Sequence, residues 1–161
     1  KSIKKTLDND TTFLFTEPGN DISSLYIKKK LFEFCRNNLN CHYKKNLGNK
    51  LYHSCINLSS GVIGNSSSGI IEAPSFKVFS IDIGDRQKGR VKPSSVISLN
   101  YNEKNIIKKI KFLKSSTKSL RKKIKNPFFK NNCCILVNKS LKKILSRKEN
   151  LRIKKFYQLK D

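Results

Sequence analysis

Short apolar runs alternate along this chain with segments in which apolar side chains recur at helical spacing, and this alternation limits the possible folds more than any other feature. Strands and helices that alternate, with short connections between them, are typical of a parallel sheet covered by helices on both faces. The predicted strands cover residues 11–15, 40–43, 61–64, 78–83 and 96–99. The predicted helices cover residues 22–36, 51–58, 70–73, 102–114, 117–124 and 136–145. Asn102 is expected to cap the fourth of them, whose apolar face carries Ile106, Ile107, Ile110 and Leu113. The sequence therefore predicts an α/β fold of the Rossmann-like type.

The length of the chain bounds its organisation, because 161 residues suffice for one domain with its own core. We expect that domain to span residues 1–146, with a charged helical tail over residues 147–161. The sequence contains no Met and begins with Lys1, so we expect a fragment that has lost an upstream part. No apolar run approaches the ~20 residues that a membrane-spanning helix needs, and no membrane association is expected.

The net charge of +24 allows two interpretations. A strongly basic surface attracts phosphate groups, which is typical of nucleic-acid-binding modules. Here, however, Lys far outnumbers Arg and is spread over almost every segment, together with many Asn, Ile and Phe residues. Bias in genomic base composition produces that mixture, whereas a nucleic-acid site usually gathers Arg among aromatic residues. Composition bias is therefore the favoured interpretation, and no nucleic-acid partner is expected.

The cysteines indicate a reducing compartment. They are odd in number and form no C-x-x-C pair. Reduced thiols, and hence a cytoplasmic location, are the favoured interpretation. The two histidines, His42 and His53, are interpreted as ordinary surface or core residues. We expect no metal site and no cofactor. The five cysteines are Cys35, Cys41, Cys55, Cys133 and Cys134.

Residues 64–72, Gly-Asn-Ser-Ser-Ser-Gly-Ile-Ile-Glu, carry the clearest chemical signal. A strand precedes this stretch and a helix follows it, so unpaired N–H groups at the helix start can bind an anion. The hydroxyls of Ser66, Ser67 and Ser68 can add donors, and Gly69 lacks the Cβ that would keep a diphosphate from the backbone. Glu72 lies one helical turn beyond Ser68, where it can accept from ribose hydroxyls. The alternative is a serine N-cap with a glutamate in the first turn, which needs no ligand.

The polar loop after the next predicted strand strengthens the first interpretation. It spans residues 84–90 and contains Arg86, Gln87, Lys88 and Arg90. Because neighbouring strands of a parallel sheet end at the same edge, this loop is expected beside the serine stretch. Arg suits bidentate phosphate contacts. Its alternative is a solvated charge cluster in a chain already rich in Lys.

Residues 64–74, Gly-Asn-Ser-Ser-Ser-Gly-Ile-Ile-Glu-Ala-Pro, and 83–90, Ile-Gly-Asp-Arg-Gln-Lys-Gly-Arg, closely resemble the signature of UDP-N-acetylglucosamine 2-epimerases. The resemblance is greatest to the hydrolysing branch. Weaker similarity extends from the Phe-Thr-Glu-Pro-Gly-Asn-Asp segment at 15–21 to the Asn-Pro-Phe step at 126–128. It implies the carboxyl-terminal half of a GT-B fold, in which two Rossmann-like domains hold the substrate between them.

The same resemblance implies which residues bind UDP. Ser66 and Ser67 would hold the diphosphate, with Ser68 and Gly69 in the same turn, and Glu72 would hold the ribose hydroxyls. Tyr52 stands where the family places an aromatic ring against uracil, although a core role in a short helix is equally open. Arg86 would contact the phosphates or support its loop.

The implied reaction is removal of UDP across C1–C2 of the sugar, followed by addition of water with inversion at C2. It needs acids and bases, which the family supplies mainly from the amino-terminal domain. No catalytic residue is therefore expected in this chain, which would bind UDP or UDP-N-acetylglucosamine but be inactive alone. The full-length protein would be a homo-oligomer. A basic nucleic-acid-binding module and a GT-B glycosyltransferase domain are the alternatives.

Overall fold

A computed structural model describes residues 2–6, 8, 10–19 and 24–146. The chain forms two compact units, Lys1–Pro127 and Phe128–Asp161. The tail predicted over residues 147–161 lies outside the described residues. In the second unit the described helix is α6 (Cys133–Leu145), and none of its residues is buried. Within the described residues, no helix has both the length and the apolar content to cross a membrane.

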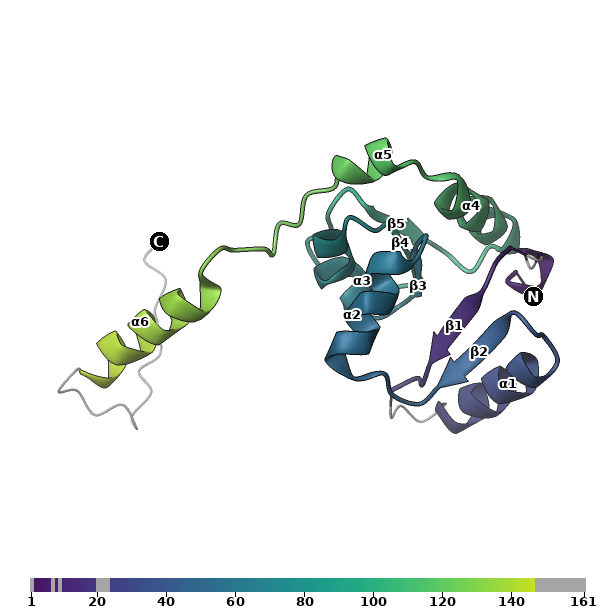
Figure 1. The fold of residues 1–161 in the computed structure, drawn as a ribbon, viewed down its shortest axis with the longest axis horizontal. Helices are drawn as coiled ribbons and strands as arrows, with labels where there is room; N and C mark the ends of the chain where they lie inside the picture. Colours follow the sequence, from purple (N-terminus) through teal and green to yellow (C-terminus); the bar gives the residue numbers. More distant parts are fainter. Residues whose placement is uncertain (1, 7, 9, 20–23, 147–161) are drawn as a thin grey trace. The chain divides into compact units, whose positions relative to one another are not determined.

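The strands of the first unit are parallel, as the alternating pattern predicts (Figure 1). They form two small sheets, one of β1 and β2 and one in the order β3-β4-β5. The first sheet pairs Phe13 with Cys41, and the second pairs Ile81 with both Ile63 and Ile97. The strands are β1 (Phe13–Thr16), β2 (Cys41–Lys44), β3 (Val62–Gly64), β4 (Ser80–Ile83) and β5 (Val96–Leu99).

Each predicted helix is present in the described residues, with its ends displaced by up to three residues. Asn102 caps α4 as predicted, since its side-chain oxygen accepts from the Asn105 amide at 3.0 Å. The helix before Pro74 ends at Ile71 and is followed by a 3-10 turn, η2 (Ala73–Phe76). A second 3-10 turn, η1 (Lys4–Thr6), precedes β1. The helices of the first unit are α1 (Ser24–Arg36), α2 (Gly48–Leu58), α3 (Ser68–Ile71), α4 (Glu103–Ser115) and α5 (Lys118–Lys122).

Helices cover both faces of the three-stranded sheet, which confirms the predicted α/β Rossmann-like architecture. On one face, Ile81 of β4 packs in a core with Ile106, Ile110 and Leu113 of α4. These three belong to the apolar face predicted for that helix. On the other face, Val62 of β3 packs against the cluster formed by α2, η2 and the residues before β4. Because successive side chains of a strand point to opposite faces, a three- or four-residue strand contributes to both cores.

Strand β4 begins two residues later than predicted, and the preceding turn explains the difference. Lys77 adopts a left-handed conformation with φ of 58°. The Val78 amide donates to Ala73 O at 3.2 Å and thereby closes the 3-10 turn. Val78 and Phe79 are buried, as the apolar run from 78 predicts. They nevertheless precede the strand, which begins at Ser80.

Candidate functional site

The stretch Ser66–Ser67–Ser68, termed here the serine turn, lies at the carboxyl end of β3 and leads into α3. Gly64 ends the strand with φ of 153°, a conformation that side chains disfavour. Within the described part of the chain, the amides of Ser66 and Ser67 donate to no other protein group. Ser67 holds the N-cap position but makes no side-chain capping bond. Ser66 Oγ accepts from the Ser68 amide at 3.4 Å, so one serine side chain does support the turn. The amides of Ser66 and Ser67 themselves remain available to an anion.

Ser68 and Gly69 differ from the other predicted contacts because both are buried. A Cβ on Gly69 would meet the Ser80 side chain at 3.4 Å, and Ser80 Oγ donates to Gly69 O at 2.6 Å. The missing side chain thus lets α3 approach β4 closely. The Gly69 amide donates to Ser66 O at 3.3 Å, which bends the serine turn toward the helix.

The loop at 84–90 lies beside the serine turn, as expected for two parallel strands that end at the same edge. Gln87 makes the connection, since its Nε2 donates to Asn65 O at 2.8 Å while its side chain is only 3 % exposed. Arg86 is exposed immediately before it. The role of Gln87 as a tether between the two loops was not among the predictions.

Below that loop, Asp82 is buried near the end of β4 and pairs with Lys92 at 2.8 Å. Lys92 also donates to Ser98 Oγ at 2.8 Å and so links β4 to β5. The second Asp82 oxygen, Oδ1, is buried without a hydrogen-bond partner among the described residues. Only one oxygen of this buried carboxylate is satisfied, and that bond comes from Lys92.

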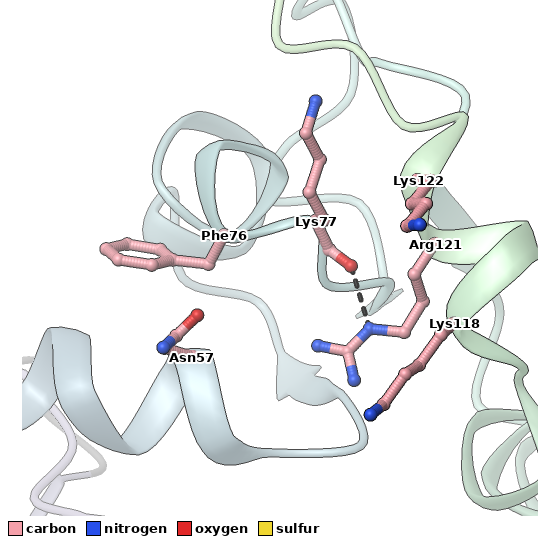
Figure 2. A pocket seen from close by; sticks show the side chains of 6 residues that line it. All are labelled: Asn57, Phe76, Lys77, Lys118, Arg121 and Lys122. Atoms are coloured by element: carbon pink, nitrogen blue, oxygen red, sulfur yellow. Dashed lines mark hydrogen bonds between the residues drawn. The ribbon is translucent and has the colours of Figure 1, made fainter.

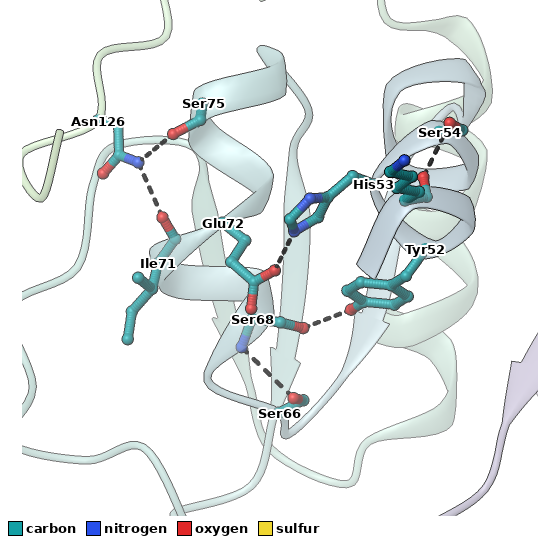
Figure 3. A network of polar contacts seen from close by, with 10 residues as sticks. Tyr52, His53, Ser54, Ser66, Ser68, Ile71, Glu72, Ser75 and Asn126 are labelled. Carbon is teal, nitrogen blue, oxygen red and sulfur yellow. Dashed lines mark hydrogen bonds and ion pairs between the residues drawn. The ribbon is translucent and has the colours of Figure 1, made fainter. Parts of the chain in front are cut away.

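Two consecutive residues of α2 face α3, and each bonds a polar side chain, one at the start of α3 and one directly after its end (Figure 3). The Tyr52 and Ser68 hydroxyls are 2.5 Å apart. His53 Nε2 lies 2.7 Å from Glu72 Oε2. The structure thus brings Tyr52, Ser68 and Glu72 together, as the site prediction requires, and adds His53. A carboxylate can only accept, so His53 Nε2 carries the hydrogen.

The interpretation of His53 as an ordinary residue missed this contact. Its ring also packs beside Phe76, with ring centroids 5.2 Å apart. At the other end of α3, Asn126 Nδ2 donates to Ile71 O at 2.8 Å and to Ser75 Oγ at 2.6 Å. Asn126 thereby satisfies a carbonyl that the helix end leaves unpaired. Its place in the Asn-Pro-Phe step was the only sequence signal for that role.

The cysteines take no part in this site, and all five are free thiols. Burial raises the pKa of the Cys41 thiol, as it does for Cys35. A raised pKa lowers the fraction of reactive thiolate, so neither thiol is prepared for nucleophilic attack.

A basic depression of about 210 Å³ lies elsewhere on the first unit (Figure 2). Arg121 Nε donates to Lys77 O at 2.9 Å, and this bond holds the guanidinium in the lining of the depression. Asn57 and Lys77 precede β3 and β4 respectively, whereas the serine turn follows β3, so the depression lies toward the opposite edge of the sheet. Its lining residues are Asn57, Phe76, Lys77, Lys118, Arg121 and Lys122.

The sequence is similar to those of several known proteins. Residues 1–142 match the family model described as UDP-N-acetylglucosamine 2-epimerase. A polysialic acid biosynthesis protein of Escherichia coli is 36 % identical over 152 residues, which cover 94 % of this chain and 38 % of that protein. A GDP/UDP-N,N'-diacetylbacillosamine 2-epimerase (hydrolyzing) of Campylobacter jejuni is 39 % identical over 108 residues, which cover 64 % of this chain and 28 % of that enzyme.

A UDP-N,N'-diacetylbacillosamine 2-epimerase (hydrolyzing) of Legionella pneumophila is 30 % identical over 98 residues, which cover 61 % of this chain and 26 % of that enzyme. The chain therefore spans less than two-fifths of the length of these curated relatives. The family match nevertheless extends over most of the chain and includes the serine turn, the loop at 84–90 and the Asn-Pro-Phe step. The chain belongs to the UDP-N-acetylglucosamine 2-epimerase family.

Proposed function

We propose that this chain is the nucleotide-binding half of a hydrolysing UDP-N-acetylglucosamine 2-epimerase, as the carboxyl-terminal domain of a GT-B enzyme. The observation that carries the proposal is the serine turn, where the amides of Ser66 and Ser67 are available beside the loop that contains Arg86. Backbone donors next to a cationic loop form a suitable site for a diphosphate. The names of the relatives from Escherichia coli and Campylobacter jejuni support a place in surface-polysaccharide or sialic-acid-like sugar synthesis.

In this proposal each site residue has one task. Ser66 and Ser67 bind the diphosphate through their amides and hydroxyls, and Arg86 approaches it from the neighbouring loop. Glu72 accepts from the ribose hydroxyls, and the Tyr52 ring contacts the uracil. Ser68 and Gly69 support the turn, Ser68 through its bond to Tyr52 and Gly69 through its packing on β4.

The whole reaction also needs acids and bases at C1 and C2 of the sugar, and we assign none of them to this chain. The chain is accordingly expected to bind UDP and UDP-N-acetylglucosamine without converting the latter. We further propose a cytoplasmic, homo-oligomeric full-length enzyme that uses neither metal nor cofactor.

Isothermal titration calorimetry with UDP tests the site. We expect Ser67→Ala and Glu72→Ala each to weaken UDP binding about tenfold or more, because each removes a hydrogen bond that involves a charged group. Ser54→Ala is the matched control, since Ser54 lies on the same helix as Tyr52 but its hydroxyl bonds, among the described residues, only Lys50 O, at 2.9 Å. If Ser67→Ala and Glu72→Ala bind UDP as the control does, the site assignment is wrong.

The nucleic-acid alternative makes a different prediction for the same proteins. A basic module would bind RNA with a steep dependence on salt, and Glu72→Ala would not weaken that binding. Tight RNA binding at physiological salt, together with no heat of UDP binding, would favour this alternative over the proposal.

A further inference from the structure

The contact between His53 and Glu72 uses only one of the two carboxylate oxygens. His53 bonds one carboxylate oxygen, Oε2, at 2.7 Å. The other oxygen, Oε1, has no hydrogen-bond partner among the described residues. Both side chains are partly open to solvent, with 42 % of His53 and 39 % of Glu72 exposed. Glu72 therefore offers one unoccupied oxygen to a ligand while the other is held.

Two aromatic rings lie near the imidazole. Its ring lies 5.2 Å from the Phe76 ring, tilted by 38°, and 6.1 Å from the Tyr52 ring. Tyr52 is itself held by its bond to Ser68. The imidazole thus has aromatic neighbours besides Glu72, whereas the contact that orients the Glu72 carboxylate among the described residues is its bond to His53.

A glutamate side chain without such a partner samples several rotamers, and each rotamer directs the carboxylate differently. Ordering it when a ligand binds costs free energy that a bond from His53 removes in advance. The benefit falls only on ligand groups that contact the carboxylate. In the proposed site those groups are the ribose hydroxyls.

We propose that His53 is a positioning residue that orients Glu72 for the ribose and so makes the site select ribonucleotides over 2'-deoxyribonucleotides. The inference rests on the proposed function, because it assumes that a nucleotide places its ribose at Glu72. His53 itself touches neither the nucleotide nor the sugar in this arrangement; it acts through the carboxylate.

Two substitutions separate orientation from packing. His53→Phe keeps an aromatic ring beside Phe76 but cannot donate to Glu72. His53→Gln loses the ring but retains an amide N–H that can donate to Oε2. A purely structural role predicts that the ring matters. A positioning role predicts that the donor matters.

The experiment measures the dissociation constants of UDP and 2'-deoxy-UDP by calorimetry for the 161-residue chain. We expect the unsubstituted chain and Ser54→Ala to prefer UDP about tenfold, the effect of one hydrogen bond to a charged group. His53→Phe and Glu72→Ala should lose most of that preference, whereas His53→Gln should keep most of it. Affinity for 2'-deoxy-UDP should fall less than affinity for UDP in His53→Phe, because 2'-deoxy-UDP has only the 3'-hydroxyl left to donate to Glu72.

The outcomes distinguish the two proposals. If the unsubstituted chain fails to bind UDP, the proposed function is wrong and this inference falls with it. If UDP binds and Glu72→Ala abolishes the preference while His53→Phe retains it, only the role of His53 is wrong. Equal loss of affinity for both nucleotides in His53→Phe would assign His53 to packing alone and would also overturn the inference.

Discussion

Substitution of Lys92 by Met should destabilise the fold because it isolates a buried carboxylate. Asp82 is 4 % exposed, and Lys92 is its only hydrogen-bond partner among the described residues. Met preserves the length and apolar character of the Lys stem, so packing along that stem is largely retained. The variant consequently removes the charge and the donor to Asp82, together with the bond to Ser98 Oγ.

The magnitude follows from the geometry. Two unit charges 2.8 Å apart attract by about 6 kcal/mol at an effective dielectric constant of about 20. Part of this attraction offsets the cost of desolvating the ammonium, which the variant no longer incurs. The Lys92 side chain is 22 % exposed, so that cost is moderate. We therefore expect a loss of about 3 kcal/mol, the lower end of the range for breaking a buried ion pair.

Urea unfolding followed by far-UV circular dichroism at neutral pH measures this loss as a fall in the midpoint with an unchanged slope. The control is Lys92→Met combined with Asp82→Asn, which removes both charges. It should be more stable than the single variant by about 1 kcal/mol or more, because no uncompensated charge is left buried. A single variant that loses less than about 1 kcal/mol, or a double variant that is no more stable than the single one, would refute the reasoning.

Two further predictions concern the loops and the pH dependence of folding. Gln87→Met removes the donor to Asn65 O, so UDP affinity should fall about five- to tenfold with a nearly unchanged urea midpoint; unchanged affinity would contradict the tether. Lys28 donates a hydrogen bond that holds the pKa of Glu17 below its usual value of 4.5. A lowered folded-state pKa adds stability above the usual pKa, and that stability is lost as pH falls through the lowered pKa. The difference in unfolding free energy between the unsubstituted chain and Lys28→Met should therefore be largest near neutral pH and shrink below about pH 4.5; a difference independent of pH would exclude this contact as its source.

The helices and strands could be predicted because, within each of them, the apolar residues recur at the spacing of either a helix or a strand. Helix α4 shows this, since the predicted apolar positions 106, 110 and 113 are buried and the predicted cap at Asn102 is formed. The start of α2 was placed three residues too late, at Leu51. Gly48 is typical of a turn, yet it begins this helix with φ of 62° while its amide donates to Asn46 Oδ1 at 2.7 Å. The bond to Asn46 thus stabilises a helix start at a residue with low helix propensity.

Of the candidate site, the sequence predicted only the contacts that follow from the order of the strands. Parallel strands end at one edge, so the proximity of the serine turn to the loop at 84–90 followed from the strand order, and Gln87 provides the contact. The bond between His53 and Glu72 depends on how α2 docks against α3, and no local pattern links positions 53 and 72. Gly69 was assigned to ligand approach, whereas the side of Gly69 that lacks a Cβ packs against Ser80.

Tyr52 and His53 are neighbours on one helix, and successive helical side chains diverge by about 100° around the axis. Rotation of α2 about its axis would move both side chains in the same sense, so their bonds to Ser68 and Glu72 cannot both be preserved. The two contacts thus oppose rotation of α2 about its axis. They also fix the separation between the Tyr52 and His53 side chains. A ligand that binds between α2 and α3 would therefore meet side chains whose separation is set before it arrives.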